Sequence, residues 1–205
     1  MEAYSDGAPA YDTRWAAYNR ATVAQLRRPL TERAPGRLLD LGCGTANLAA
    51  ALGGWGSHPE LYLGVDLAPE MLAVARGKLR ASPPGFPWAL AAGDASALPV
   101  ASGTLETVVS ASSLHYWPDP AATLALVRAA LRPGGRLVIL DWARDTLPMR
   151  VLDRWLRWRG ERYRRVYTLA EGVSLLEAAG FRVRRAGRHR GPAWWELLVV
   201  EAEAP

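Results

Sequence analysis

The stretch Leu39-Asp-Leu-Gly-Cys-Gly-Thr45 decides the fold. It completes a short apolar strand that starts at Arg37, and it then enters a glycine turn that leads into a helical segment. Glycine at positions 42 and 44 lets the backbone approach a ligand closely, and the first turn of the following helix offers free N–H groups. The stretch therefore predicts a ligand-binding loop between a strand and a helix.

Strand-like and helix-like segments alternate around this loop. The expected strands cover residues 37–41, 61–66, 88–92, 104–111, 136–142, 181–185 and 194–201. The expected helices cover residues 12–28, 45–52, 69–80, 119–131, 148–166 and 169–179, the first ending before Pro29 and the second stopping at Gly53-Gly54. The regular alternation predicts a parallel α/β sheet with helices on both faces, and the last two strands predict an antiparallel hairpin at its edge.

Three acidic residues mark the carboxyl ends of the first three expected strands. They are Asp40, Asp66 and Asp94. In an open α/β sheet these strand ends meet in the crevice that binds ligands, although each acid alone could be a helix cap or a turn former. Asp66 lies 22 residues beyond Gly44, close to the spacing of about 20 for an acid that bonds ribose hydroxyls.

The loop does not fit a dinucleotide-binding oxidoreductase. Asn47 stands where the third glycine of that fingerprint belongs. The carboxylate of Asp40 would also repel a pyrophosphate, whereas it would attract a cationic ligand.

Composition narrows the class of protein. The single cysteine, Cys43, forms no intrachain disulfide, and no Cys/His spacing indicates a zinc site. The chain of 205 residues carries a net charge of +5, and residues 144–190 carry +8 against −3 for the rest. A basic segment of this kind can bind nucleic acid, an anionic membrane or an acidic small substrate, or can simply be a solvated surface.

The sequence shows no targeting or membrane-spanning signal. Residues 1–9 contain two acids, no base and no apolar stretch, so they do not resemble a signal peptide. No apolar run reaches 18 residues without a charge or a helix breaker, so no transmembrane span is expected. We expect a cytoplasmic protein.

Five stretches in order carry a family resemblance. They are Leu38-Leu-Asp-Leu-Gly-Cys-Gly-Thr-Ala46, Gly64-Val-Asp-Leu-Ala-Pro-Glu-Met-Leu72, Gly93-Asp-Ala-Ser-Ala-Leu-Pro99, Ser112-Ser-Leu-His-Tyr-Trp117 and Leu131-Arg-Pro-Gly-Gly-Arg-Leu137. Together they resemble the class I S-adenosylmethionine-dependent methyltransferases, most of all the small-molecule branch with the ubiquinone/menaquinone-biosynthesis and trans-aconitate-type enzymes.

The resemblance implies a fold and an activity. The fold is a Rossmann-like, mostly parallel sheet of seven strands in the order 3-2-1-4-5-7-6, with the last strand antiparallel. The activity is direct in-line methyl transfer from S-adenosylmethionine to a small-molecule acceptor, with S-adenosylhomocysteine as product and no metal. A single methyltransferase domain, residues 1–205, would comprise a lid helix (1–30), a cofactor-binding core (31–142), a substrate-cover segment (143–168) and a C-terminal helix with edge hairpin (169–205).

The resemblance also assigns cofactor contacts residue by residue. Asp40 would hold the ammonium of the methionine moiety, Asp66 would accept from both ribose hydroxyls, and Asp94 would accept from the adenine amino group. The remaining expected contacts are Gly42, Cys43 and Gly44 through their backbone, Leu67 and Met71 against the adenine, the N–H of Ala95, and Ser112. For Met71 ordinary core packing is an equal alternative.

His115 is the candidate catalytic residue, because it follows the fourth strand, where the acceptor should sit. It would act as a base for an acceptor that carries a proton, or would orient the substrate. A structural role is the alternative, and a carboxylate acceptor would need no base because its pKa lies near 4.

The segment Ser112-Ser-Leu-His115 differs from the Asn/Asp-Pro-Pro-aromatic tetrad of amino-methylating nucleic-acid enzymes. Cys43 also lies in the wrong loop for a cytosine C5 nucleophile, so a nucleic-acid substrate is not favoured. An RNA methyltransferase that uses the basic 144–190 segment stays an alternative. A catalytically silent cofactor-binding protein is another.

The expected substrate-cover helix has an apolar stripe of Val151, Leu152, Trp155, Leu156 and Trp158. We expect this stripe to pack on the pocket mouth or on the N-terminal helix. The arginines outside it, between positions 150 and 165, are expected to be solvated, or one or two of them to pair with an anionic substrate.

Overall fold

A computed structural model describes residues 8–159 and 163–205. Its strands are β1 (Arg37–Leu41), β2 (Leu61–Asp66), β3 (Trp88–Ala92), β4 (Leu105–Ala111), β5 (Leu131–Trp142), β6 (Arg182–Arg190) and β7 (Glu196–Glu203). Its helices are α2 (Ala8–Arg14), α3 (Ala16–Thr31), α4 (Asn47–Trp55), α5 (Pro69–Ala81), α6 (Pro120–Ala130), α7 (Leu147–Trp158) and α8 (Leu169–Ala178), and a 3₁₀ turn η1 covers Leu114–Tyr116.

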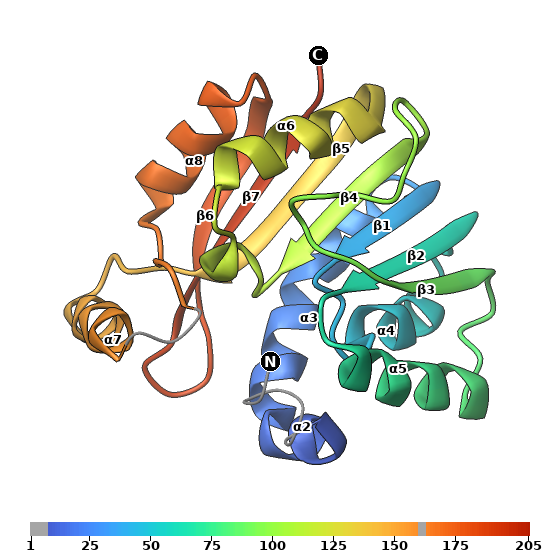
Figure 1. Ribbon diagram of the computed structural model, residues 1–205, viewed down its shortest axis with the longest axis horizontal. Helices are drawn as coiled ribbons and strands as arrows, with labels where there is room; N and C mark the ends of the chain where they lie inside the picture. Colours follow the sequence, from blue (N-terminus) through green and yellow to red (C-terminus); the bar gives the residue numbers. More distant parts are fainter. Residues whose placement is uncertain (1–7, 160–162) are drawn as a thin grey trace.

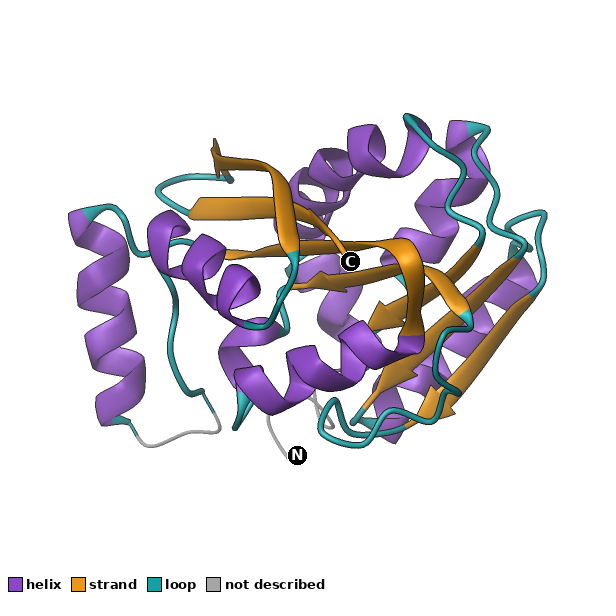
Figure 2. Ribbon diagram, turned by 90° about the horizontal axis from the view of Figure 1, so that it is seen from above, coloured by secondary structure: helices purple, strands orange, loops and turns teal. Residues whose placement is uncertain are grey.

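The strands form one sheet in the order β3-β2-β1-β4-β5-β7-β6, as the resemblance predicts (Figure 1). Five neighbouring strands run parallel, and β7 pairs antiparallel with both β5 and β6. Helices cover both faces of the sheet (Figure 2). The carboxyl ends of β1 to β5 consequently meet along one edge.

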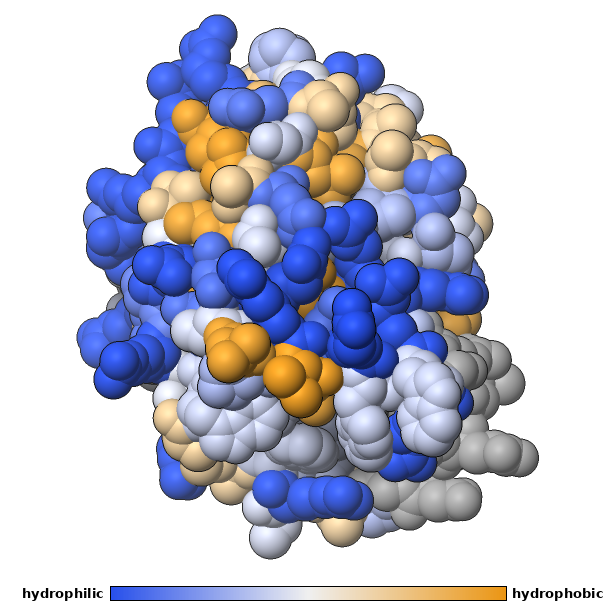
Figure 3. All heavy atoms as spheres, turned by 90° about the vertical axis from the view of Figure 1, so that its left-hand side faces the viewer, coloured by the Kyte–Doolittle hydropathy of each residue, from blue (hydrophilic) through white to orange (hydrophobic). Residues whose placement is uncertain are grey.

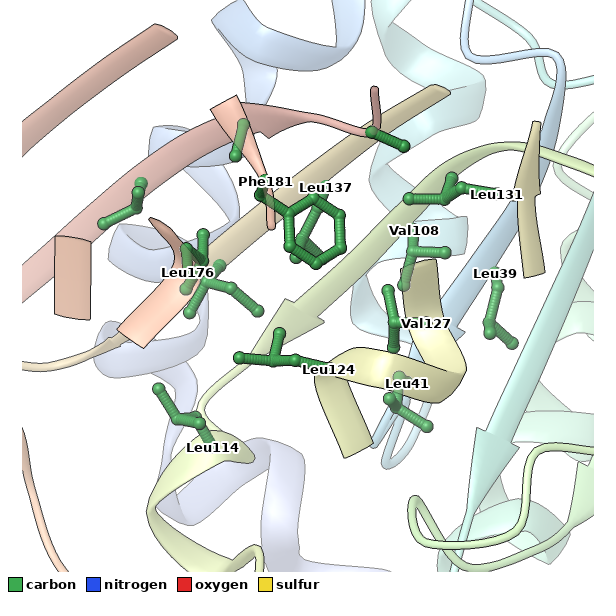
Figure 4. Packing of buried hydrophobic residues seen from close by; sticks show 14 of the residues in the cluster. Leu39, Leu41, Val108, Leu114, Leu124, Val127, Leu131, Leu137, Leu176 and Phe181 are labelled. Atoms are coloured by element: carbon green, nitrogen blue, oxygen red, sulfur yellow. The ribbon is translucent and has the colours of Figure 1, made fainter. Parts of the chain in front are cut away.

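Two hydrophobic cores lie on opposite faces of the sheet. On one face, α6 and α8 pack on the central strands through residues such as Leu124, Val127 and Leu176 (Figure 4). On the other face, α3, α4 and α5 pack through residues such as Leu26 and Leu52. Because successive strand side chains point to opposite faces, β1 places Leu39 in the first core and Leu38 in the second.

Two helices differ from their expected limits. The helix expected over residues 12–28 is divided at Trp15 into α2 and α3, and α3 continues through Pro29 to Thr31. Proline removes only one hydrogen bond in this last turn, and burial of Leu30 on the sheet favours its continuation. α4 likewise continues through Gly53 and ends at Trp55, where it is followed by the C-cap residue Gly56 with a left-handed φ of 71°.

Gly53 serves close packing and does not stop the helix. A Cβ atom at this position would lie 2.6 Å from the carbonyl oxygen of Pro84, so only glycine fits against that loop. The next residue, Gly54, has open space around it.

Three further boundaries differ. β5 begins at Leu131, five residues earlier than expected, because Leu131 pairs with Leu105 at the start of β4. The hairpin strand β6 is longer than expected and β7 is shifted by two residues toward the C-terminus, so that the turn between them covers residues 191–195. The helix expected over residues 148–166 ends at Trp158, and residues 163–166 have no helical structure.

The apolar stripe expected along this helix is only partly covered. Leu152 and Leu156 are half-buried, whereas Val151, Trp155 and Trp158 are exposed, and the fully buried residues of α7 are Met149 and Asp153. For the three exposed residues the expectation was wrong, because helical periodicity locates an apolar face but does not say what covers it.

No helix within residues 8–159 and 163–205 is long and apolar enough to cross a membrane.

The two adjacent glycines of α4 predict opposite effects of the same substitution. Gly54→Ala should raise the free energy of unfolding by up to about 1 kcal/mol, because alanine has the higher helix propensity. Gly53→Ala should lower it by about 1–3 kcal/mol, because the new methyl group meets the Pro84 backbone. Urea unfolding of both variants measures the difference, and equal effects would contradict this packing.

Candidate active site

The loop after β1 is fixed on β2 by its backbone. The N–H groups of Gly42 and Cys43 donate to the carbonyl oxygen of Val65, at 2.8 Å and 3.1 Å. Gly42 has a left-handed φ of 80°, and a Cβ atom there would lie 2.5 Å from Oγ of Ser113. Glycine is therefore required at position 42 both for the turn and for the approach of the β4 loop.

Asp66 holds the same loop from the end of β2. Its carboxylate accepts from the N–H of Gly44 at 2.7 Å and from the N–H of Ala68 at 2.9 Å, where α5 begins. Burial raises the pKa of Asp66, and these backbone donors offset part of that effect. The side chain thus joins the glycine loop to the start of the next helix.

Asp40 is a buried carboxylate at the end of β1, with 2% of its surface exposed. Its Oδ2 atom accepts a hydrogen bond of 2.6 Å from the hydroxyl of Tyr62. Burial raises its pKa to about 7, and the nearby charge of Asp66 adds to the rise although the Tyr62 bond opposes it. An arriving cation would stabilise the ionised form of Asp40.

The predicted adenine contacts lie around the ends of β2 and β3. Leu67, next to the half-buried Asp66, is 49% exposed. Met71 is buried in a small cluster with Ala8 and Ala68, an environment in keeping with core packing, and its expected adenine contact stays a prediction. Asp94 accepts from the backbone and hydroxyl of Ser96 through one oxygen, as a turn former does.

Helix α2 is attached to the loop by a polar cluster that the sequence did not reveal. Lys78, the single lysine of the chain, donates to Asp12 at 2.6 Å, to Asn47 at 2.8 Å and to Thr45 at 3.3 Å. Burial alone would raise the pKa of Asp12, but its hydrogen bonds, that of Lys78 first, lower it. The three hydrogens of an ammonium match the three acceptors, which a planar guanidinium would not.

Cys43 has the environment of a packing residue. Burial, together with the nearby charges of Asp40 and Asp66, raises the pKa of its thiol well above the ordinary value. The thiolate that nucleophilic chemistry needs is therefore disfavoured. In the described part of the chain, no group of three or more His, Cys, Asp or Glu residues could hold a metal ion.

Ser112 marks the end of β4. It has a left-handed φ of 57°, which is uncommon for a residue with a side chain and is concentrated at functional sites. Its Oγ atom lies 2.6 Å from the hydroxyl of Tyr18, which also accepts a 2.7 Å hydrogen bond from Nε1 of Trp142. Burial raises the pKa of Tyr18 further above its ordinary range, so this phenol stays neutral.

His115 lies beneath the segment that follows α7. It is 2% exposed, and its carbonyl oxygen accepts from the N–H of Arg164. Its ring Nδ1 atom is 2.5 Å from Oδ1 of Asp141, and its backbone N–H donates to Oδ2 of the same carboxylate at 3.2 Å. In a neutral imidazole, the carboxylate at Nδ1 is the acceptor, so Nδ1 carries the hydrogen and the lone pair lies on Nε2.

The Nε2 atom of His115 is buried without a hydrogen-bond partner among the residues that the structure describes. Buried polar atoms are normally paired, so an unpaired one calls for a functional explanation. Aromatic rings surround the imidazole: Trp142 stacks on it at 4.4 Å between centroids, and Tyr116 and Tyr163 lie at 4.2 Å and 5.9 Å.

Asp141 is the site residue that sequence reasoning missed. It ends β5 as Asp40 and Asp66 end β1 and β2, so the rule that found those acids would also have found it. The structure brings the predicted residues together as two adjoining groups. The first lies at the ends of β1 to β3, and the second comprises Ser112 and His115 beyond β4.

Residues 39–139 match the family model described as a methyltransferase domain. The chain carries a methyltransferase domain. The matched range includes every candidate site residue that the sequence predicted and ends just before Asp141.

Two curated relatives are similar over this domain. The demethylmenaquinone methyltransferase of Thermus thermophilus is 36% identical over 144 residues, which cover 68% of this chain and 64% of the relative. The malonyl-[acyl-carrier protein] O-methyltransferase of Laribacter hongkongensis is 36% identical over 153 residues, which cover 67% of this chain and 50% of the relative. The methyltransferase chain thus spans between half and two thirds of the length of these relatives.

The fold is also that of solved methyltransferases. The crystal structure of magnesium protoporphyrin IX methyltransferase from Synechocystis PCC 6803, with bound SAH, has a TM-score of 0.71 at 22% identity, covering 93% of this chain and 84% of that one. At this identity the likeness establishes a shared fold.

The buried Asp40 predicts a pH-dependent effect of Asp40→Asn on stability. Because its folded-state pKa of about 7 exceeds the ordinary 3.8, this group lowers the free energy of unfolding as pH rises from about 4 to about 7. Asparagine can still accept from Tyr62 but does not ionise. In urea unfolding without ligand, the free energy of unfolding of the variant should therefore rise relative to that of the wild type across this pH window. Above about pH 7 the difference should stay constant. A difference independent of pH would contradict the assigned burial cost.

Proposed function

We propose that this methyltransferase domain transfers a methyl group from S-adenosylmethionine to a small-molecule acceptor whose proton is taken by His115. The observation that carries the proposal is that acids able to hold a cation and a histidine able to accept a proton lie along one edge of the sheet. Two acids suited to a cation lie at the ends of β1 and β2, where Asp40 is buried and Asp66 is half-buried. A carboxylate-held imidazole with a bare nitrogen lies beside the ends of β4 and β5.

The first group of residues fits the cofactor. Asp40 is buried without a cationic partner among the described residues, so it would meet the ammonium of the methionine moiety. Asp66 would accept from the ribose hydroxyls, and the exposed Leu67 would be covered by the adenine. The adenine edge would face Asp94, whose second oxygen is not used by Ser96, and the N–H of Ala95.

The rest of the ligand would lie along the backbone of Gly42, Cys43 and Gly44, where both glycines have a left-handed φ. A sulfonium bound there supplies an activated methyl group with its own leaving group, so direct in-line displacement needs no covalent enzyme intermediate. The protein's own tasks are to align the acceptor, exclude water and remove a proton.

His115 supports the last task. Asp141 accepts from Nδ1, which fixes the tautomer and turns Nε2 toward the acceptor as a base. The neighbouring Trp142, Tyr116 and Tyr163 form apolar and aromatic walls, which favour a planar or apolar acceptor over a strongly hydrated one. Since His115 is almost fully covered, an acceptor reaches Nε2 only when this aromatic cover moves.

Calorimetry with S-adenosylhomocysteine tests the cofactor half. The wild type should bind, and Asp66→Ala should weaken binding roughly a hundredfold because hydrogen bonds to a charged group are lost. Glu70→Ala is the matched control, since it removes an exposed carboxylate from the first turn of α5. Absence of wild-type binding, or equal affinity in both variants, would refute the assignment.

NMR of the imidazole nitrogens tests the catalytic half without knowledge of the acceptor. Neutral His115 should carry its hydrogen on Nδ1, and Asp141→Asn should change the tautomer or its pH dependence. His115→Gln identifies its signals among those of the three histidines. With an acceptor in hand, either variant should lower kcat by roughly 10²–10⁴ and leave S-adenosylhomocysteine affinity unchanged. A hydrogen on Nε2, or unaltered turnover, would contradict the role of a base.

A further inference from the structure

Helix α7 lies at one end of the molecule (Figures 1 and 2). It presents several apolar side chains to solvent. The exposed fractions are 73% for Leu147, 62% for Val151, 47% for Trp155 and 82% for Trp158. Their spacing of four, four and three residues places these side chains in one line along the helix, which we call the α7 apolar stripe. Such a stripe normally packs against another element, whereas these four side chains stay exposed in the part of the chain that the structure describes.

A row of arginines runs beside the stripe. Arg150, Arg154 and Arg157 repeat at spacings of four and three and are exposed; we call them the α7 arginine row. Within residues 8–159 and 163–205, none of the three forms an ion pair with a carboxylate, although Nε of Arg150 donates to the carbonyl oxygen of Arg144. Figure 3 shows apolar side chains next to densely gathered hydrophilic ones on this face of the molecule.

The arginine row also borders a hollow. A surface groove of about 570 Å³ is lined by Arg144, Arg150, Asp153, Arg154, Arg157 and Trp158. The carboxylate of Asp153 accepts hydrogen bonds from the hydroxyl of Tyr163 and from the backbone N–H of Val166. Both donors lie on the segment that follows α7. The positive charges of Arg150, Arg154 and Arg157 along this groove therefore favour an anionic group there.

We propose that α7 binds the surface of an anionic lipid bilayer, with the stripe at the level of the acyl chains and the arginine row on lipid phosphates. The two rows match the two layers that such a surface offers, because interfacial helices combine a basic row with Trp and Leu on an apolar face. Arginine suits phosphate through its planar, bidentate donor fork. This inference concerns a surface outside the candidate active site and does not depend on the proposed function.

Two other occupants fit less well. A two-fold dimer through α7 would place the same patch on both subunits, which brings the two arginine rows close together without compensating acids. Nucleic acid would satisfy the arginines but would leave Leu147 and Val151 in water, since a phosphate backbone offers no apolar layer. A bilayer is the occupant that uses both rows.

Vesicle co-sedimentation of the full chain tests the proposal. We expect binding to vesicles of phosphatidylcholine with phosphatidylglycerol, weak binding to phosphatidylcholine alone, and a loss of binding as salt is raised. Soluble inorganic phosphate at the same phosphate concentration should not replace the vesicles, because it offers nothing to the stripe.

Matched variants separate the two rows. Replacing Arg150, Arg154 and Arg157 by Gln should weaken binding to anionic vesicles roughly a hundredfold, whereas the same change at the exposed Arg20, Arg27 and Arg80 should have little effect. Leu147→Gln should weaken binding roughly tenfold, whereas Leu126→Gln on α6 should not. All these side chains are exposed, so circular dichroism should show folded variants.

Several outcomes would overturn the proposal. These are equal binding to neutral and anionic vesicles, no binding to either, or equal effects of the two triple variants. Tight oligonucleotide binding without vesicle binding would assign the surface to nucleic acid instead. Light scattering that shows a dimer broken by Leu147→Gln, again without vesicle binding, would assign it to a second copy.

Discussion

The contact between Gly42 and Ser113 is the constraint on which the candidate site depends. It joins the loop after β1 to the loop after β4, and a Cβ atom at position 42 would lie 2.5 Å from the serine hydroxyl. Because the two loops touch, the acids at the ends of β1 and β2 and the imidazole of His115 occupy one continuous edge. A side chain at position 42 would push apart the residues at the ends of β1 to β3 and the group of Ser112 and His115, even if each group kept its own structure.

Charge burial is the second feature that organises this edge. Asp40 is kept in the interior with a pKa of about 7, and the imidazole of His115 is kept there with a bare nitrogen. Both arrangements oppose folding, since buried charges and unpaired polar atoms are unfavourable. Placing such groups at adjoining strand ends is the pattern of a site built for a ligand, and the proposed methyl transfer would use both.

The sequence predicts most of the sheet and the first group of site residues, for a clear physical reason. Buried parallel strands are short apolar runs, and the acids that follow them, such as Asp40 and Asp66, stand out against those runs. Asp141 follows the same rule but lies outside the five stretches that carry the family resemblance. The Lys78 and Asp12 cluster could not be found, since residues 66 positions apart share no local pattern.

The roles of Gly53 and of the α7 apolar stripe depend on tertiary packing, which the periodicity of the sequence does not show. Gly53 is a helix stop by its conformational preference but a contact residue by its distance to Pro84. The stripe on α7 has the spacing of a packed face and yet lies in water.

A crystal structure with bound S-adenosylhomocysteine tests the central claim most directly, namely that cofactor and acceptor share this edge. The account predicts the ribose on Asp66, the amino group of the methionine moiety beside Asp40, Leu67 covered by the adenine, and the sulfur facing His115. A ligand bound away from the ends of β1 and β2, or one whose sulfur points away from His115, would contradict it.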